Sequence, residues 1–384
     1  MAELVEDGVD CIAKLVETIH CEGVENYAHL ARSAGLPEKT VWYKVTTQFP
    51  RRGLVLHACV NYEKIGLAVK IVTLTFSNQC SRSVTRTLGA MAKHLYITYF
   101  GKTVGSQVYT LRLAVPSNVW TEYKDFIEYL SEKGVVDSFT VEDVWWARHI
   151  PMRTDLYDFQ RGEWAFEWSQ LEKLQTPTPE RPLSSPDPSV EEPDYVDLAI
   201  LSELQANATL SISKIASNIR VSEDIAYYHY TEHVKKRGLI SQYLVGWVGT
   251  GGRYDHNSVS QVFFILKGAE KEDTKRVQLI FQSFPFSWLE FLTVNGNYYV
   301  FSNIPVSHLN AAMHYISQKT QGLEDNLEIR ILDTYESGGF ALPLEMFDKK
   351  RGGVFNKAQT IKYFTGLLRY NVQPPPSNLI NLLY

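Results

Sequence analysis

Apolar residues recur at four-residue spacing in two short stretches that lie far apart in the chain. The two rows are Val41, Val45 and Phe49, and Ala226, Tyr230 and Val234. Side chains four apart share one face of a helix, so each stretch predicts a helix with one buried stripe and a free opposite face. A shorter helix is predicted just before each, ending near Ala31 and Ala216. Each pair of helices indicates a helix-turn-helix, whose second helix has a face free to enter the major groove of DNA.

The two stretches are copies of each other. Residues 30–55 and 215–240 align without a gap at a constant offset of 185 residues, as between Gly53 and Gly238. Each copy ends its second helix with a basic residue and then glycine. A basic residue is favoured at the negative C-terminal end of a helix, and glycine is favoured where the backbone then turns left-handed. The sequence therefore predicts a tandem duplication.

These motifs resemble the Lrp/AsnC family of transcriptional regulators. The family pattern L-A-x-x-x-G-L-S-x-x-T-V, with a later basic residue before G-[VIL]-I, appears here as Leu30-Ala31, Gly35-Leu36-Pro37, Thr40-Val41 and Arg52-Gly53-Leu54-Val55. The second copy keeps Ile215-Ala216, Val221-Ser222 and Arg237-Gly238-Leu239-Ile240, with Arg220 in place of the turn glycine. The resemblance implies a dimerisation and effector-sensing domain after each helix-turn-helix.

Strand and helix patterns alternate after each copy. In the first half, residues 66–148 read strand, helix, strand, strand, helix, strand, and the second half repeats this order. Such an order predicts a four-stranded antiparallel sheet with two helices on one face. The fold class is therefore α+β, with two winged helix-turn-helix units, each followed by a ferredoxin-like βαββαβ domain. Residues 57–64 are predicted to be an extended hinge.

Domain boundaries follow from these elements and from one proline-rich stretch, residues 175–193, that favours an extended spacer. The predicted units are residues 1–56, the first helix-turn-helix; 57–174, the first ferredoxin-like domain with an extension; 175–193, the linker; 194–241, the second helix-turn-helix; and 242–384, the second ferredoxin-like domain with a C-terminal extension.

Length and charge constrain these predictions further. The 384 residues suit two or more domains, and a net charge of −5 argues against indiscriminate coating of nucleic acid. The acidic start lacks signal-peptide features, and no apolar run approaches the ~18 residues that span a bilayer. We therefore expect a cytoplasmic protein without a membrane partner. The four cysteines form no close pair and accompany no zinc-type histidine spacing, which favours buried or incidental thiols.

The DNA-reading face of each second helix can be assigned from the same periodicity. The predicted contacts are Lys39, Thr40, Tyr43, Lys44, Thr47, Arg51 and Arg52 in the first copy, and Tyr228, His229, Lys235, Lys236 and Arg237 in the second. Charges from residue 38 to residue 52 sum to +3, whereas acidic residues offset the cations of the second copy. The first copy is thus expected to be the better DNA reader. A winged helix that only packs against its neighbours is the alternative in both copies.

The effector site implied by the resemblance is incomplete. The family's G-x-[YF]-D turn reads Gly105-Ser106-Gln107-Val108 in one half and Gly296-Asn297-Tyr298-Tyr299 in the other, and neither holds the aspartate. Both glycines then serve as tight strand turns. The sequence predicts no catalytic residue, no cofactor and no metal site.

The main hypothesis is a DNA-binding transcriptional regulator, not an enzyme, that imitates an Lrp/AsnC dimer within one chain. Its partners would be double-stranded DNA and a small-molecule effector, and a homodimer through the ferredoxin-like domains stays open. The first alternative is a sirohaem-decarboxylase-like tetrapyrrole enzyme, because sirohaem decarboxylases look like tandem Lrp/AsnC units. It would need a basic cavity between the sheets with histidines, for which His57, His94, His149, His256, His308 and His314 are available. The second alternative is an architectural or protein-interaction module without sequence-specific DNA binding.

Overall fold

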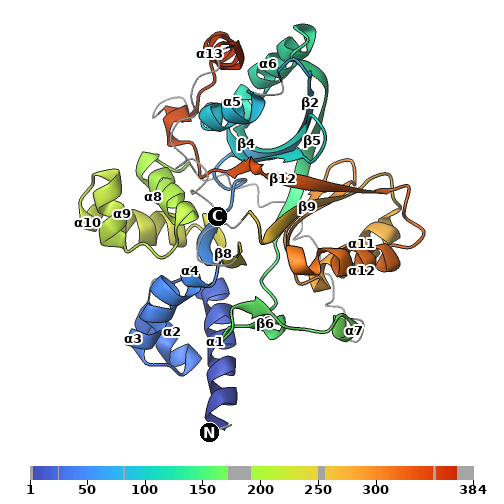
Figure 1. Ribbon diagram of the computed structural model, residues 1–384. Coiled ribbons are helices and arrows are strands. Elements are labelled where there is room, and N and C mark those ends of the chain that lie inside the picture. The colour runs from blue at the N-terminus through green and yellow to red at the C-terminus, as the bar shows by residue number, and fades with distance from the viewer. Residues whose placement is uncertain are drawn as a thin grey trace.

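We describe the protein from a computed structural model (Figure 1). The described residues are 3–24, 26–80, 83–171, 192–249, 256–348 and 352–369. Most of the predicted linker, residues 175–191, lies outside these ranges, as do residues 370–384 of the predicted C-terminal extension.

The first half begins with helices and continues as a strand-rich region. Its elements are α1 (Glu3–Glu22), α2 (Tyr27–Ala34), α3 (Glu38–Tyr43), η1 (Lys44–Gln48), α4 (Phe49–Arg51), β1 (Leu54–Val60), β2 (Leu67–Phe76), α5 (Val84–Met91), β3 (Ile97–Thr103), β4 (Val108–Pro116), η2 (Ser117–Val119), α6 (Trp120–Glu132), β5 (Val136–His149), η3 (Thr154–Leu156), β6 (Tyr157–Asp158), β7 (Glu163–Trp164) and α7 (Trp168–Leu171).

The second half repeats this order of elements, except that it has no counterpart of α4. They are α8 (Tyr195–Ala206), α9 (Ile212–Ile219), α10 (Glu223–Tyr228), η4 (His229–Lys235), β8 (Ile240–Trp247), β9 (Val259–Leu266), α11 (Lys271–Ser283), β10 (Ser287–Thr293), β11 (Tyr298–Pro305), η5 (Val306–His308), α12 (Leu309–Lys319), β12 (Leu327–Gly339), η6 (Leu344–Met346), β13 (Phe347–Asp348), β14 (Gly352–Gly353) and α13 (Lys357–Arg369).

The strands of both halves form one closed barrel, so the fold is mixed α/β around eight strands. Its order is β10-β11-β9-β12-β3-β4-β2-β5. Within this ring each half contributes four neighbouring strands, in the order β5-β2-β4-β3 or β12-β9-β11-β10. The halves join where β12 pairs with β3 and β10 pairs with β5, both antiparallel. The sequence predicted two sheets but not this pairing of their edges, because edge pairing between distant strands leaves no local pattern.

Helices cover the outside of the barrel (Figure 1). Helices α5 and α6 pack on the strands of the first half, and α13 packs on α5 and α6, in a core that contains the fully buried Tyr96 and Leu113. Helices α11 and α12 pack on those of the second half, around Phe264 and Phe281. The barrel interior has its own apolar cluster, to which both halves contribute, with Ile71 from one and Phe301 from the other.

A two-stranded ribbon connects the helical parts of the two halves. Strand β1 pairs with β8 in antiparallel register, with Leu54 opposite Trp247 and His57 opposite Leu244. The predicted hinge at residues 57–64 therefore begins as a strand, since β1 runs to Val60. The apolar residues of β1 need burial, and β8 supplies both the backbone partner and part of the core that covers them.

The helical parts bury the stripes that the sequence predicted. Val41, Val45 and Phe49 are at most 2% exposed, as are Ala226, Tyr230 and Val234. Gly35 takes a left-handed conformation at the turn, and Arg220 takes the same conformation at the corresponding place in the second half. Each second helix changes to π-helical winding partway, in η1 and in η4. Over the described ranges, no helix is both long and apolar enough to cross a membrane.

Candidate functional site

A small cavity lies where β1, β3, β4, β5, β10 and β12 approach helix α8. It is lined by His57, Ala58, Cys59, Val60, Tyr62, Thr98, Arg112, His149, Gln205, Trp288 and Gly339. Its volume is about 40 Å³. A buried water needs roughly 10–15 Å³ by this measure, so the cavity has room for about three waters or one carboxylate group.

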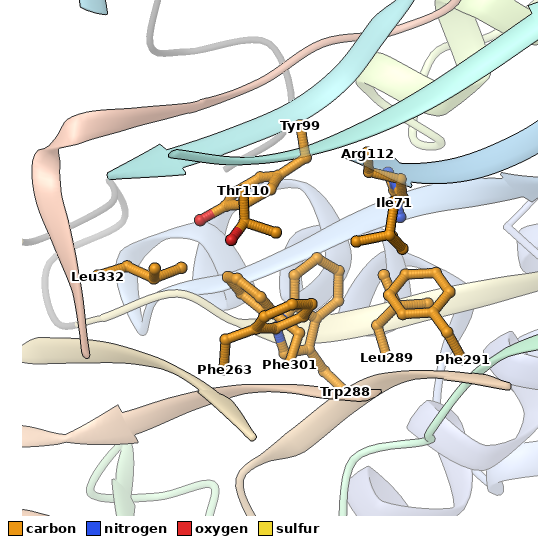
Figure 2. A pocket seen from close by; sticks show the side chains of 10 residues that line it. All are labelled: Ile71, Tyr99, Thr110, Arg112, Phe263, Trp288, Leu289, Phe291, Phe301 and Leu332. Carbon is orange, nitrogen blue, oxygen red and sulfur yellow. The ribbon is translucent and has the colours of Figure 1, made fainter. Parts of the chain in front are cut away.

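A second, apolar cavity of about 20 Å³ adjoins the first inside the barrel (Figure 2). Its walls are Ile71, Tyr99, Thr110, Arg112, Phe263, Trp288, Leu289, Phe291, Phe301 and Leu332. Arg112 and Trp288 line both cavities. Arg112 therefore places a guanidinium at the boundary between an apolar barrel interior and a more polar space beside the β1–β8 ribbon.

Arg112 is a partly buried cation whose charge is not balanced nearby. Its Nε donates a hydrogen bond to Thr98 Oγ1 at 2.8 Å, and the Thr98 hydroxyl donates to the Arg112 carbonyl at 3.0 Å. Across the described part of the chain, no carboxylate forms an ion pair with Arg112. A cation withdrawn from water without a counter-ion costs free energy, and an anionic ligand would reduce that cost.

Two histidines face the same cavity and stay neutral. Burial, and then the positive charge of Arg112, lower the pKa of His57 to about 4. The same two causes, and then the neighbouring His57, lower the pKa of His149 to about 3. At neutral pH both imidazoles can therefore donate or accept a hydrogen bond without adding charge.

Hydrogen bonds from the surrounding elements fix the polar walls. Gln205 on α8 donates to Tyr62 Oη at 2.6 Å and accepts from the Leu342 amide at 3.0 Å. Gln242 on β8 donates to the His149 carbonyl at 3.1 Å. Burial raises the pKa of the Cys59 thiol to about 12, so this residue is a neutral wall and not a nucleophile.

The duplication supplies this constellation in the first half only. Pro116 pairs with Leu67, the first residue of β2, and Pro305 pairs with Val259, the first residue of β9. Counting four residues back from each proline reaches Arg112 and Phe301. The position of His57 corresponds to Gln242 at the 185-residue offset. The barrel strand therefore forms without an arginine at this position, and the ribbon strand forms without a histidine, since the other half has the corresponding strands with Phe301 and Gln242.

The residues predicted to contact DNA lie on or just after the second helices. In the first half, Lys39, Thr40 and Tyr43 are on α3, Lys44 and Thr47 on η1, and Arg51 and Arg52 at its end. Tyr43 is 48% exposed, whereas the Lys44 ammonium donates to Gln48 at 3.1 Å. The Arg52 carbonyl accepts from Tyr157 at 3.1 Å. The helices thus bring these residues together, and their role in DNA contact stays an untested prediction.

The predicted residues of the second half are more involved in contacts within the chain. They are Tyr228, His229, Lys235, Lys236 and Arg237. The ring of His229 meets Asp197, with Nδ1 2.8 Å from Oδ1, and Lys236 pairs with Glu232 at 2.8 Å. The Arg237 carbonyl accepts from the Lys64 ammonium at 3.1 Å. Tyr228 is 55% exposed.

Comparison with known proteins gives similarity to solved structures. No protein-family model and no curated protein matches the chain. The chain resembles a siroheme decarboxylase, NirDL: 12% of residues are identical, the TM-score is 0.49, and the match covers 92% of this chain and 97% of that one. The same enzyme in complex with an iron-uroporphyrin III analogue gives 12% identity and a TM-score of 0.48, covering 84% of this chain and 90% of that one. The structure of PH0061 matches 37% of this chain and 93% of its own, with 16% identity and a TM-score of 0.30. At these values the likeness transfers neither substrate nor activity to this chain.

Two predictions from the sequence need correction. The DNA-binding transcriptional regulator and the absence of enzymatic activity are corrected, because the matches that span most of both chains are to a siroheme decarboxylase; the tetrapyrrole enzyme was the first alternative. The cavity agrees with that alternative by its own geometry, because it lies between the halves and holds a cation and two histidines. The predicted DNA and effector partners have no support, and the predicted homodimer and cytoplasmic location stay untested.

The sequence named two residues of this cavity and missed the others. His57 and His149 were among the six histidines available to the tetrapyrrole alternative, whereas Arg112, Tyr62 and Gln205 were not singled out. One signal was present: Arg112 interrupts the apolar run VYTLRLAVP, where the corresponding strand YYVFSNIP has phenylalanine. A charge at the centre of a barrel strand would have drawn attention to this position.

Proposed function

We propose that the chain is an enzyme that binds a carboxylate-bearing tetrapyrrole at the cavity lined by His57, Arg112 and His149, and removes a carboxyl group from it. The observation that supports this most directly is the partly buried Arg112 guanidinium, flanked by two neutral histidines and lacking a carboxylate partner within the described residues. A planar guanidinium binds a carboxylate through two parallel hydrogen bonds, and such bonds are strong where water is excluded.

The cavity matches one carboxylate arm of such a ligand and not its ring. With a volume of about 40 Å³, it takes roughly three non-hydrogen atoms. A macrocycle would have to lie outside this space, or the wall formed by Trp288 would have to move. We propose that Arg112 selects the arm that reacts, and that the ring binds across the junction between the halves.

The residues present suit loss of carbon dioxide with proton uptake. The bond between the carboxyl carbon and the adjacent carbon breaks, carbon dioxide leaves, and the electron pair remains on that carbon. This carbon then takes one proton, so R–COO⁻ and H⁺ give R–H and CO₂. Apolar walls such as Val60 and Trp288 favour the step, because they exclude water from a carboxylate whose charge disperses as the bond breaks. His57 and His149 are the proton donors in reach of the cavity, and a bound anion would raise their pKa toward the range needed for proton transfer.

We also propose the finer architecture on which this site depends. Each half would consist of a helix-turn-helix followed by a ferredoxin-like domain, with boundaries at residues 1–56, 57–174, 194–241 and 242–384. The repeated order of elements and the equivalent strand order of the two halves support this division.

Incubation of the chain with iron uroporphyrin tests the proposal. Binding should shift the Soret band, and turnover should yield a product lighter by one carbon dioxide per event in mass spectrometry. Arg112→Gln should weaken the Soret response, while His149→Gln should leave binding largely intact and slow product formation.

Arg161→Gln is the matched control, because the Arg161 side chain is 73% exposed and pairs at the surface with Asp158 and Glu163. It should behave as the unaltered chain does. No Soret shift with the unaltered chain, or an equal response from Arg112→Gln and Arg161→Gln, would refute the proposed site. Binding without mass loss would leave a tetrapyrrole-binding protein and reject the decarboxylation.

A further inference from the structure

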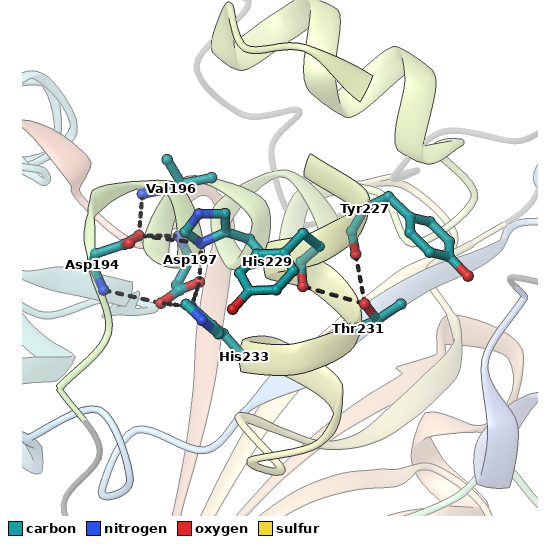
Figure 3. A network of polar contacts seen from close by, with 8 residues as sticks. Asp194, Val196, Asp197, Tyr227, His229, Thr231 and His233 are labelled. Atoms are coloured by element: carbon teal, nitrogen blue, oxygen red, sulfur yellow. Dashed lines mark hydrogen bonds and ion pairs between the residues drawn. The ribbon is translucent and has the colours of Figure 1, made fainter. Parts of the chain in front are cut away.

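Four potential metal ligands converge on the second helical part, away from the cavity described above. They are Asp194 and Asp197 at the start of α8, and His229 and His233 on η4 (Figure 3). One ligand atom from each lies within 4.8 Å of the other three. Both carboxylates and both rings point toward the same small space (Figure 3).

The separations are close to those of a loaded metal site. His229 Nδ1 lies 2.8 Å from Asp197 Oδ1 and 3.6 Å from Asp194 Oδ1, and His233 Nδ1 lies 3.0 Å from the same Asp197 oxygen. Tetrahedral zinc with bonds of roughly 2.0–2.2 Å holds its ligand atoms about 3.3–3.6 Å apart. These three separations differ from that spacing by about half an ångström or less, and all four ligand atoms lie within 4.8 Å of one another.

Local structure holds these side chains in place before any metal binds. Asp194 is the N-cap of α8, accepting from the amides of Val196 and Asp197 at 2.8 and 3.0 Å. Asp197 accepts in return from the Asp194 amide at 3.0 Å, and its side chain is only 1% exposed. His229 and His233 are four residues apart in π-helical winding, which brings their ring centres to 4.6 Å. Such segments often accompany functional sites in other proteins.

The first half provides an internal comparison for Asp197, His229 and His233. At the 185-residue offset, Asp197 corresponds to Ile12, His229 to Lys44 and His233 to Gln48. Ile12 is buried in the apolar core, and Lys44 donates to Gln48 at 3.1 Å. The same helix packing therefore forms with none of these three ligands. A buried aspartate that faces two histidines is a feature that the second half has in addition to its fold.

We propose that Asp194, Asp197, His229 and His233 bind one divalent transition-metal ion of the zinc class. Two imidazoles with two carboxylates are a donor set for zinc or cobalt, whereas calcium and magnesium prefer oxygen alone. On binding, each Nδ1 gives up its hydrogen bond to Asp197 and coordinates through its lone pair, and each ring proton moves to Nε2. The ion would join the first turn of α8 to η4 and fix the second helical part, independently of the enzymatic proposal.

Cobalt and zinc titrations of the full chain test this site. One equivalent of Co²⁺ should give the intense visible bands of four-coordinate cobalt without the near-ultraviolet thiolate band that binding at the free cysteines would produce. Zn²⁺ should displace it and raise the unfolding temperature.

The informative variant is His229→Lys with His233→Gln, which gives the second half the pair that the first half already carries. It should fold, as circular dichroism can verify, and lose metal affinity by on the order of 100-fold or more. His29→Gln is the matched control, because His29 pairs with the single carboxylate of Glu22. Absence of visible bands, a thiolate band in their place, or equal affinity of the double variant and the unaltered chain would overturn the proposal.

Discussion

Replacing Arg112 with glutamine should affect ligand binding and histidine titration together. Arg112 is the cation shared by the two adjoining cavities, and it lowers the pKa of both His57 and His149. Glutamine keeps a hydrogen-bonding side chain but removes the charge. We expect weaker carboxylate binding, higher pKa values for both histidines, and little change in stability.

The sizes of these effects follow from the contacts. A hydrogen bond to a charged group contributes about 1.5–3 kcal/mol, so loss of the guanidinium should weaken carboxylate binding about 10- to 150-fold. Burial is the larger cause of the low pKa of His57 and of His149, so both values should rise but stay below the ordinary 6.5. The lost bond to Thr98 costs about 1 kcal/mol, and relief of an unbalanced charge offsets it.

The assay combines three measurements on Arg112→Gln and on the surface control Arg161→Gln. Histidine titrations by NMR give the pKa values, a Soret or calorimetric titration gives the affinity, and urea unfolding gives the free energy. Unchanged titration of His57 and His149 in Arg112→Gln would refute the electrostatic account of the cavity. A loss of stability above about 3 kcal/mol would instead identify Arg112 as a structural residue, since a loss of that size marks a broken buried network.

Three further predictions concern stability. Burial lowers the pKa of His20 and His57 to about 4, and of His149 to about 3, so the unfolded chain binds more protons just below pH 6.5. Acidification from pH 6.5 toward 4 should therefore lower the unfolding free energy, by up to about 1.4 kcal/mol per pH unit for each histidine. Urea unfolding across this range should show that the unfolding free energy of His149→Gln depends less steeply on pH. An unchanged pH dependence would contradict the contribution of His149. Gly53→Ala should lower the free energy of unfolding by about 3 kcal/mol or more, because Gly53 has a φ of +72° and an added Cβ would lie 1.4 Å from the Gly249 carbonyl oxygen. Gly35→Ala, with a φ of +67° and open space around it, should cost only about 1–2 kcal/mol, and equal unfolding temperatures for the two variants would reject the steric argument. Arg148→Met should lower the free energy of unfolding by about 3–5 kcal/mol, since Arg148 pairs at 2.7 Å with Glu290, which is fully buried. If the lost pairing is the reason, the double variant Arg148→Met with Glu290→Leu should recover part of this stability in thermal unfolding.

Local patterns in the sequence anticipated the parts of the fold that depend on local rules. Four-residue spacing identified Val45 and Tyr230 as core residues, and both are at most 2% exposed. Glycine chemistry identified the turns at Gly105 and Gly296, which both have positive φ. The gap-free duplication anticipated the repeated order of helices and strands.

What the sequence did not reveal depends on contacts between distant segments. The pairing of β5 with β10 and of β3 with β12 closes the barrel, yet any of these edge strands could have paired with another chain. That closure, with the β1–β8 ribbon, brings His57, Arg112 and His149 to one cavity. In the second half, His229 was predicted to face DNA, but its ring turns toward Asp197, because a buried carboxylate on α8 lies within hydrogen-bonding distance.

Closure of the barrel by strands from both halves also bears on how the chain could be divided. A polypeptide ending before α8 would leave the backbone amides and carbonyls of β3 and β5 exposed along two open edges. Such edges attract other strands, so a fragment made alone should self-associate or precipitate. Produced together, the two fragments have complementary edges and should assemble into a heterodimer, which makes this protein a natural candidate for a split reporter.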